Sequence, residues 1–157
     1  MTDDLHQAET SRGRPSGLLA EFDVASEPGR EREAMWLVAD ALGPLHLTPR
    51  QMERVKTAVA ETALNAMEHG NRYQAELPVH IQCRATPLLL IVTVQDQGGE
   101  TPVPLSAQVP DLMAKLAGEQ SPRGWGLFLI RSMVDELVVE SDAQSHVITL
   151  VWRLGEE

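Results

Sequence analysis

Three polar residues at regular spacing lie within a stretch whose other residues predict a helix. Glu61, Asn65 and His69 follow one another at intervals of four, so in a helix they share one face. Val59 and Ala63 each lie two residues from Glu61, about 200° around the helix, which turns the polar stripe away from the core. Asparagine disfavours a helix interior, which indicates a partner for its oxygen, and an amide oxygen is a suitable ligand for Mg²⁺. The alternative interpretation is an ordinary solvated helix face.

A carboxylate stands at the end of an apolar run that predicts a strand. Asp96 follows this run and precedes Gly98 and Gly99. A carboxylate accepts a hydrogen bond from an exocyclic amine such as that of adenine, and glycines let the backbone approach a flat base closely. The alternative is a strand-ending turn, which is common.

A third feature is the run Arg123-Gly124-Trp125-Gly126-Leu127, which opens another helical pattern. Glycines expose backbone N–H groups, and a helix N-terminus attracts anions. Arg123 adds a fixed positive charge, so the run predicts a phosphate-binding turn, with a flexible helix start as the alternative.

Residues 100–122 are rich in glycine and proline and are interpreted either as a lid that closes over phosphates or as a disordered insert.

The elements that must position these residues follow from hydrophobic periodicity. Thr48 and Pro49 are typical of a helix N-cap and first helical position, and strands occur in adjacent pairs without a helix between them. This order predicts an α/β two-layer sandwich, with a mixed, largely antiparallel sheet covered by helices on one face. The predicted strands are residues 18–24, 79–84, 88–94, 137–141 and 147–153, and the predicted helices are residues 28–41, 48–70, 111–117 and 127–134.

Composition excludes several classes of protein. The chain has 157 residues, which fits a polar tail at 1–16 and one domain at 17–157. A net charge of −10 with two lysines disfavours direct nucleic-acid binding. No apolar run is long enough to span a membrane. Cys83 is the one cysteine and alternates with apolar residues, which predicts a core side chain and a reducing, cytoplasmic setting.

Familiar catalytic patterns are missing from the sequence. It has no P-loop, no zinc-binding histidine spacing and no nucleophile elbow around a serine.

In their order along the chain, the three motifs resemble those of the GHKL (Bergerat-fold) ATPases. The nearest resemblance is to the bacterial anti-sigma-factor serine/threonine kinases. Residues 60–70, which read Ala-Glu-Thr-Ala-Leu-Asn-Ala-Met-Glu-His-Gly, resemble the N-box of that family. Residues 94–98 resemble its first glycine box and residues 123–130 its second. The resemblance extends over about residues 18–154.

The resemblance implies a role for each motif. Asn65 would hold Mg²⁺ against the triphosphate of ATP, Asp96 would bind the adenine amine, and Glu61 would be the general base that takes a proton from a substrate hydroxyl. Glu100 stands where the first glycine box normally has its second glycine; either Gly99 compensates by a shift of one residue or the entry to the lid is altered. The implied nucleotide site consists of Asn65, His69, Asp96, Gly98, Gly99, Arg123, Gly124, Trp125, Gly126 and Leu127.

The resemblance also implies partners. It predicts an ATP-dependent protein serine/threonine kinase that sequesters a sigma factor and phosphorylates a STAS-domain anti-anti-sigma protein, and that forms a homodimer through residues 18–42. The alternative is a non-catalytic ATP-binding module that acts by sequestration alone. A detached histidine-kinase catalytic domain is disfavoured, because no phospho-acceptor helical hairpin precedes the motifs.

Overall fold

The computed structural model describes residues 15–98 and 122–155, and of residues 122–127 the backbone alone. The predicted tail up to residue 14, the predicted short helix at 111–117, the predicted lid up to residue 121 and the side chain of Glu100 lie outside the described residues.

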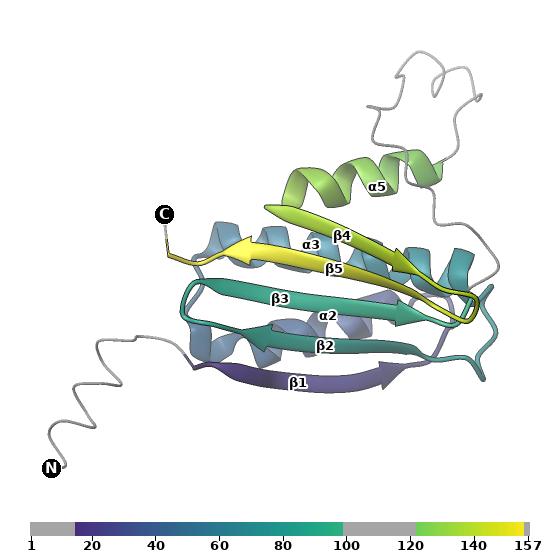
Figure 1. Ribbon diagram of the computed structural model, residues 1–157, viewed down its shortest axis with the longest axis horizontal. Helices are drawn as coiled ribbons and strands as arrows, with labels where there is room; N and C mark the ends of the chain where they lie inside the picture. The colour runs from purple at the N-terminus through teal and green to yellow at the C-terminus, as the bar shows by residue number, and fades with distance from the viewer. Residues whose placement is uncertain (1–14, 99–121, 156–157) are drawn as a thin grey trace, which may run out of the picture.

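Five strands form a single sheet in the described part of the chain (Figure 1). The strand order is β1-β2-β3-β5-β4, and every neighbouring pair is antiparallel. The predicted sandwich is confirmed, and both predicted hairpins form. The strands are β1 (Gly17–Val24), β2 (Val79–Ala85), β3 (Leu89–Asp96), β4 (Glu136–Ser141) and β5 (His146–Arg153).

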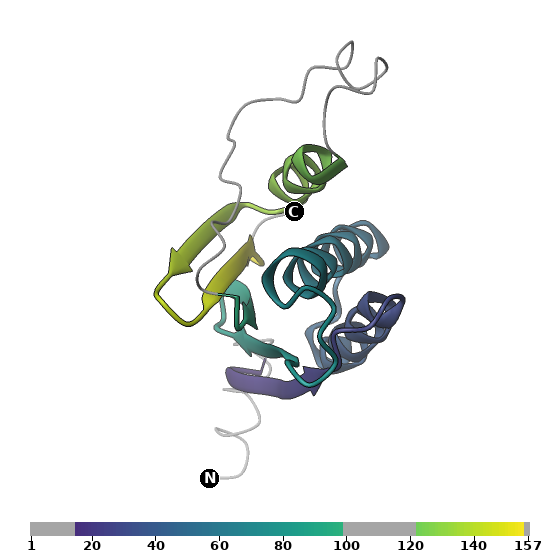
Figure 2. The same cartoon turned by 90° about the vertical axis from the view of Figure 1, so that its right-hand side faces the viewer.

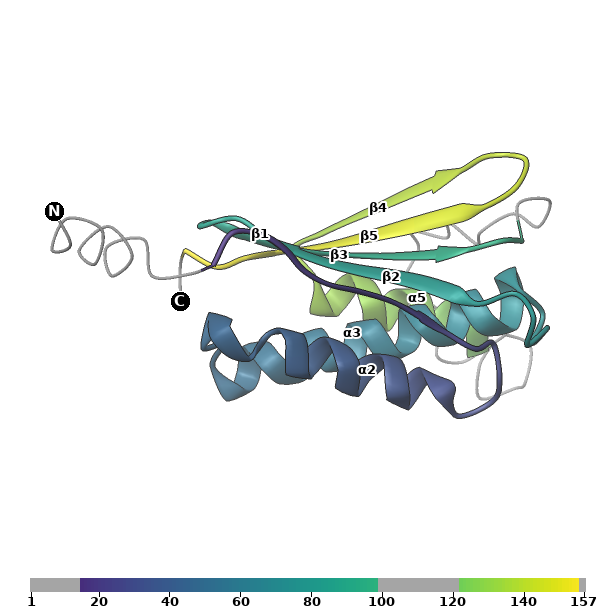
Figure 3. The ribbon, with the colours of Figure 1, turned by 90° about the horizontal axis from the view of Figure 1, so that it is seen from below.

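The helices lie together on one face of this sheet (Figure 3). They are α2 (Arg30–Ala41), the 3₁₀ turn η1 (Gly43–Leu45), α3 (Pro49–Asn65), the π-helical turn η2 (Ala66–Gly70) and α5 (Pro122–Met133). Figure 2 shows α2 and α3 side by side on one face of the sheet. No helix within 15–98 or 122–155 is long and apolar enough to cross a membrane.

Alternation along the strands determines which face packs against the helices. Ile81, Leu90 and Leu150 point to the helical layer and are fully buried, whereas Ile91, between two buried neighbours on β3, is half-buried on the open face. β3 is central, as its apolar run predicts. Cys83 is a core residue, and burial raises the pKa of its thiol to about 12, so it is no nucleophile.

The start of α3 is fixed by its first residues, as predicted. The Thr48 hydroxyl accepts from the backbone N–H of Gln51 at 3.1 Å, and the Gln51 side chain accepts from the backbone N–H of Thr48 at 2.9 Å. With Pro49 at the first position this is a capping box. One buried face of α3, including Val55, Val59 and Ala63, then anchors the helix to the sheet.

The end of this helix differs from the prediction. The sequence predicts a continuous α-helix to residue 70, but the last five residues form the π turn η2, in which the Asn71 N–H donates to the Ala66 carbonyl at 2.8 Å. Glu61 and Asn65 keep their α-helical spacing, whereas His69 lies in the wider turn. The common face of all three residues is met by Glu61 and Asn65 and stays a prediction for His69. Single π turns within α-helices are frequent at functional sites.

Two other helix boundaries also differ. The predicted helix at 28–41 begins at Arg30, because Gly29 before it has a left-handed φ of 91°. The predicted helix at 127–134 begins at Pro122, where proline fits the first turn. Gly124, Trp125 and Gly126 therefore lie in the first turns of α5 instead of in a loop before it.

Candidate nucleotide site at the end of β3

Asp96 is the floor of the candidate site. It is the last residue of β3 and only 4% exposed. Its Oδ1 atom accepts from the backbone N–H of Gly98 at 2.9 Å and lies 2.9 Å from Nδ1 of His146. Oδ2 accepts no hydrogen bond from the described residues. One carboxylate oxygen is thus fixed by the protein, and the other is left for an external donor.

Two glycines allow η2 to approach this carboxylate. A Cβ on Gly70 would lie 2.2 Å from Cγ of Asp96, and a Cβ on Gly98 would lie 1.9 Å from the carbonyl oxygen of Gly70. Gly70 is absent from the glycines with positive φ, so it is needed here for space and not for a left-handed helix end. Gly98, which belongs to the predicted site, and Gly70, which does not, therefore both stand where any side chain would fill the space beside Asp96.

His146 is a site residue that the sequence prediction missed. It begins β5, directly opposite Asp96 in the β3–β5 register, and is 2% exposed. Against a carboxylate, Nδ1 carries the hydrogen and donates. Its Nε2 is buried with no hydrogen-bond partner among the described residues. Spacing could not reveal His146, because its contact with Asp96 depends on cross-strand register.

Asn71 is a second residue that the sequence prediction missed, and it connects the end of η2 to the residue that follows β3. Its side chain is buried, donates to the carbonyl of Leu77 at 2.8 Å, and accepts from the backbone N–H of Gln97 at 2.7 Å. The next two residues, Arg72 and Tyr73, have φ angles of 52° and 54°. Such left-handed conformations cost about 1–2 kcal/mol per residue, so the Asn71 hydrogen bonds stabilise a strained turn beside Asp96.

Glu61 and Asn65 occupy the helical wall, one turn apart on α3. Both are half-buried, and neither side chain makes a hydrogen bond with the described residues. Burial raises the pKa of Glu61, and the negative charge of Glu31 on α2 raises it further. Oε2 of Glu31 is itself buried without a partner among the described residues. This face of α3 thus combines a carboxylate of raised basicity, Glu61, with the amide oxygen of Asn65, which accepts no hydrogen bond from the described residues.

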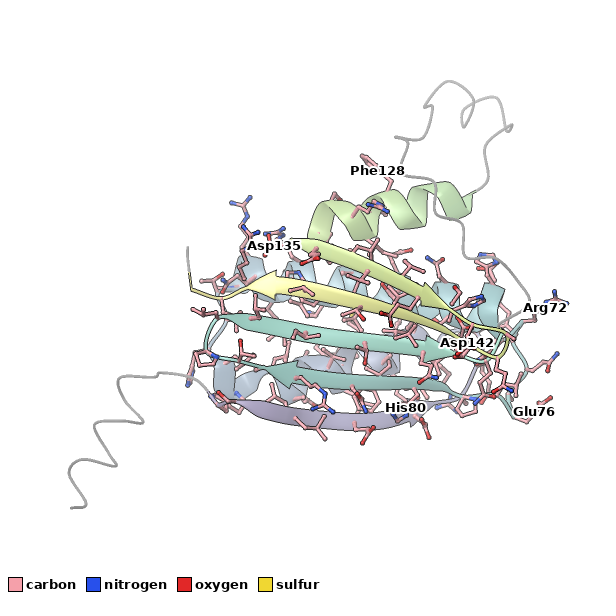
Figure 4. All side chains as sticks on the ribbon, in the orientation of Figure 1. Arg72, Glu76, His80, Phe128, Asp135 and Asp142 are labelled. Carbon is pink, nitrogen blue, oxygen red and sulfur yellow. The ribbon has the colours of Figure 1, made fainter. Side chains whose placement is uncertain are left out.

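The first turn of α5 lies toward the same end of the sheet as the end of β3 (Figure 1). Figure 4 shows Arg72 and Asp142 at this end and Asp135 at the other. The N-terminus of α5 directs partial positive charge toward anions. Gly124 and Gly126 are on this turn, whereas Gly99 and the side chains of Arg123, Trp125 and Leu127 lie outside what the structure describes. His69 lies in η2 with its Nε2 3.6 Å from the Glu68 carboxylate.

These residues fit an adenine nucleotide. The free oxygen of Asp96 and the glycine-lined floor suit the amine and flat ring of a base. Asn65 supplies an oxygen ligand of the type that Mg²⁺ prefers. No cluster of three or more histidine, cysteine or acidic residues that could hold a metal occurs within the described ranges. The α/β sandwich fold and the glycine-lined surface around Asp96 are together typical of a nucleotide-binding domain.

Comparison with known proteins gives the family. The histidine kinase-like ATPase domain family matches residues 24–152, so the chain belongs to that family, whose description implies ATP as a ligand. The chain is 30% identical over 132 residues to the anti-sigma F factor of Clostridium novyi, covering 80% of this chain and 87% of the relative. It is 30% identical over 122 residues to the anti-sigma F factor of Geobacillus stearothermophilus, covering 78% and 81%.

A solved structure has the same fold. The SiaB–SiaC complex of Pseudomonas aeruginosa contains a chain that matches with a TM-score of 0.60 and 17% identity, covering 96% of this chain and 97% of the other.

Proposed function

We propose that this protein is an ATP-dependent serine/threonine kinase of the partner-switching type, which sequesters a sigma factor and phosphorylates a STAS-type anti-anti-sigma protein. The observation that carries the kinase assignment is Glu61, a half-buried carboxylate of raised pKa that lies one helical turn from Asn65 on α3. The names of the relatives support the anti-sigma role.

Each residue has a defined task in this proposal. Asp96 binds the adenine amine through Oδ2, while His146 and Gly98 keep Oδ1 in place. Bound Mg-ATP supplies the phosphoryl group and the cation that neutralises its charge. Asn65 holds the cation, and the first turn of α5 receives the phosphates. Glu61 accepts the proton of the substrate hydroxyl, and a raised pKa brings it closer to the working pH, as a general base requires.

The test is phosphate transfer from γ-labelled ATP to candidate STAS-domain proteins. Glu61→Gln should bind ATP with unchanged affinity and lose at least about 100-fold in transfer rate, the usual contribution of a general base. Glu53→Gln is the matched control, because Glu53 lies on the same helix, is exposed and pairs with Lys56.

Two outcomes would count against the kinase. Transfer by Glu61→Gln at the wild-type rate would remove Glu61 as the base. Tight ATP binding without transfer to any STAS protein would favour the non-catalytic module.

The homodimer remains part of the proposal. β1 is an edge strand, so one side of it has unpaired backbone groups that a second copy could use. Sedimentation equilibrium of the full chain tests this, and a monomer at all concentrations would contradict it.

A further inference from the structure

A cavity lies at the end of the sheet away from the candidate nucleotide site. It has a volume of about 500 Å³ and is formed by the start of α3, the start of β3 and the end of β5. Figure 4 labels Asp135, which lines it, at the end of the sheet opposite Arg72 and Asp142. Leu90 in this cavity and Asp96 in the nucleotide site are six residues apart on β3, or about 20 Å at the rise of a strand.

The lining is apolar in its depth and basic at its rim. Val55, Leu90 and Trp152 are buried, and the indole N–H of Trp152 is already donated to the Met133 carbonyl. Arg50 and Arg153 are exposed and Arg54 is half-buried. The cavity therefore presents an apolar floor beneath charged side chains that reach solvent.

The three arginines have no counter-ion among the described residues. No ion pair joins Arg50, Arg54 or Arg153 to any residue in the described ranges, although the chain carries a net charge of −10. Asp135 is the one acidic residue of the lining, and its Oδ2 accepts the backbone N–H of Arg153 at 2.7 Å. Three positive charges against one negative charge leave an excess that favours an anionic partner.

We propose that this cavity is a docking site for an acidic segment of a partner protein, in which carboxylates pair with the three arginines and an apolar side chain enters the floor. Arginine pairs with carboxylates through two parallel hydrogen bonds. A small polyvalent anion would instead need several donors converging on one point, whereas the buried lining is apolar and the arginines come from two separate elements. The site is independent of the proposed kinase activity, and a segment held here leaves the nucleotide site uncovered.

The test uses a rhodamine-labelled hexapeptide of alternating leucine and glutamate, titrated with the full chain without nucleotide and followed by fluorescence anisotropy. The control peptide has glutamine in place of glutamate. The glutamate peptide should bind at 50 mM salt and weaken at 300 mM, as charge pairing requires. Arg54→Gln and the double variant Arg50→Gln/Arg153→Gln should each weaken binding at least about fivefold.

Arg84→Gln is the matched control, since Arg84 is exposed on β2 and does not line the cavity. It should change binding less than twofold, and melting curves should show that all variants fold. Equal binding of the glutamine peptide, no binding at low salt, or equal weakening by Arg84→Gln would each overturn the proposal. Inorganic phosphate that binds with the same dependence on Arg54, while the peptide does not bind, would identify a small-anion site instead and also overturn it.

Discussion

Replacing Gly70 by alanine should disrupt both stability and nucleotide binding, because there is no space for a methyl group. The new Cβ would lie 2.2 Å from Cγ, 2.3 Å from Oδ2 and 2.6 Å from Oδ1 of Asp96. Optimal contacts of this kind are about 3.5–4.0 Å, so η2 and the carboxylate must separate by about 1 Å or more. Asp96 resists this displacement, because Gly98 and His146 hold its Oδ1.

The magnitudes follow from this overlap. Overpacking of a buried site costs about 1–3 kcal/mol, and about 2–4 °C of melting temperature is lost per kcal/mol for a chain of this size. Gly70→Ala should therefore melt about 2–12 °C below the wild type. A displaced carboxylate also loses a hydrogen bond to the base worth about 1.5–3 kcal/mol, so the Kd for ATP should rise at least about tenfold.

Calorimetric titration with ATP and a thermal melt provide both numbers. Gly43→Ala is the control, because a Cβ there meets nothing within 4 Å and Gly43 has no positive φ. It should leave the melting temperature and the Kd unchanged. Wild-type stability and wild-type ATP affinity in Gly70→Ala would refute the close packing of η2 on Asp96 and its role in the site.

Three further predictions concern other parts of the fold. Thr48→Ala removes the capping box of α3 and should lower the free energy of unfolding by about 1 kcal/mol without changing the Kd for ATP, as urea unfolding and titration can show. His146→Leu leaves Oδ1 of Asp96 with one donor fewer and should lower the free energy of unfolding by about 1–3 kcal/mol. An unchanged unfolding midpoint would show that the hydrogen bond between His146 and Asp96 does not stabilise the fold. Glu31→Gln removes a charge that raises the pKa of Glu61. A base works when deprotonated, so the acid limb of the transfer pH–rate profile should move to lower pH, and a move to higher pH would refute the coupling.

The parts of the fold that depend on local sequence could be predicted. Thr48 with Pro49 determines the start of α3, and alternation determines which strand residues face the helices. The two hairpins follow from strands that adjoin in sequence. The spacing of Glu61 and Asn65 also predicts correctly that they share one helical wall, because both lie before the π turn.

The rest depends on contacts between distant residues. The π turn is fixed by Asn71, whose side chain joins Leu77 and Gln97 on separate segments. The contact between His146 and Asp96 requires the exact pairing of β3 with β5. The predicted helix at residues 48–70 places Gly70 at its end, whereas the constraint on Gly70 is the carboxylate packed against it. Local periodicity carries no information on any of these three contacts.

The proposed nucleotide site depends above all on Asp96, which would bind the adenine base of ATP at the end of β3. Isothermal titration of ATP with Mg²⁺ into the wild type and Asp96→Asn tests it most directly. We expect saturable binding of ATP to the wild type and a Kd at least about tenfold higher for Asp96→Asn, since a charged acceptor is lost. Absence of binding to the wild type, or equal affinity in both proteins, would contradict it.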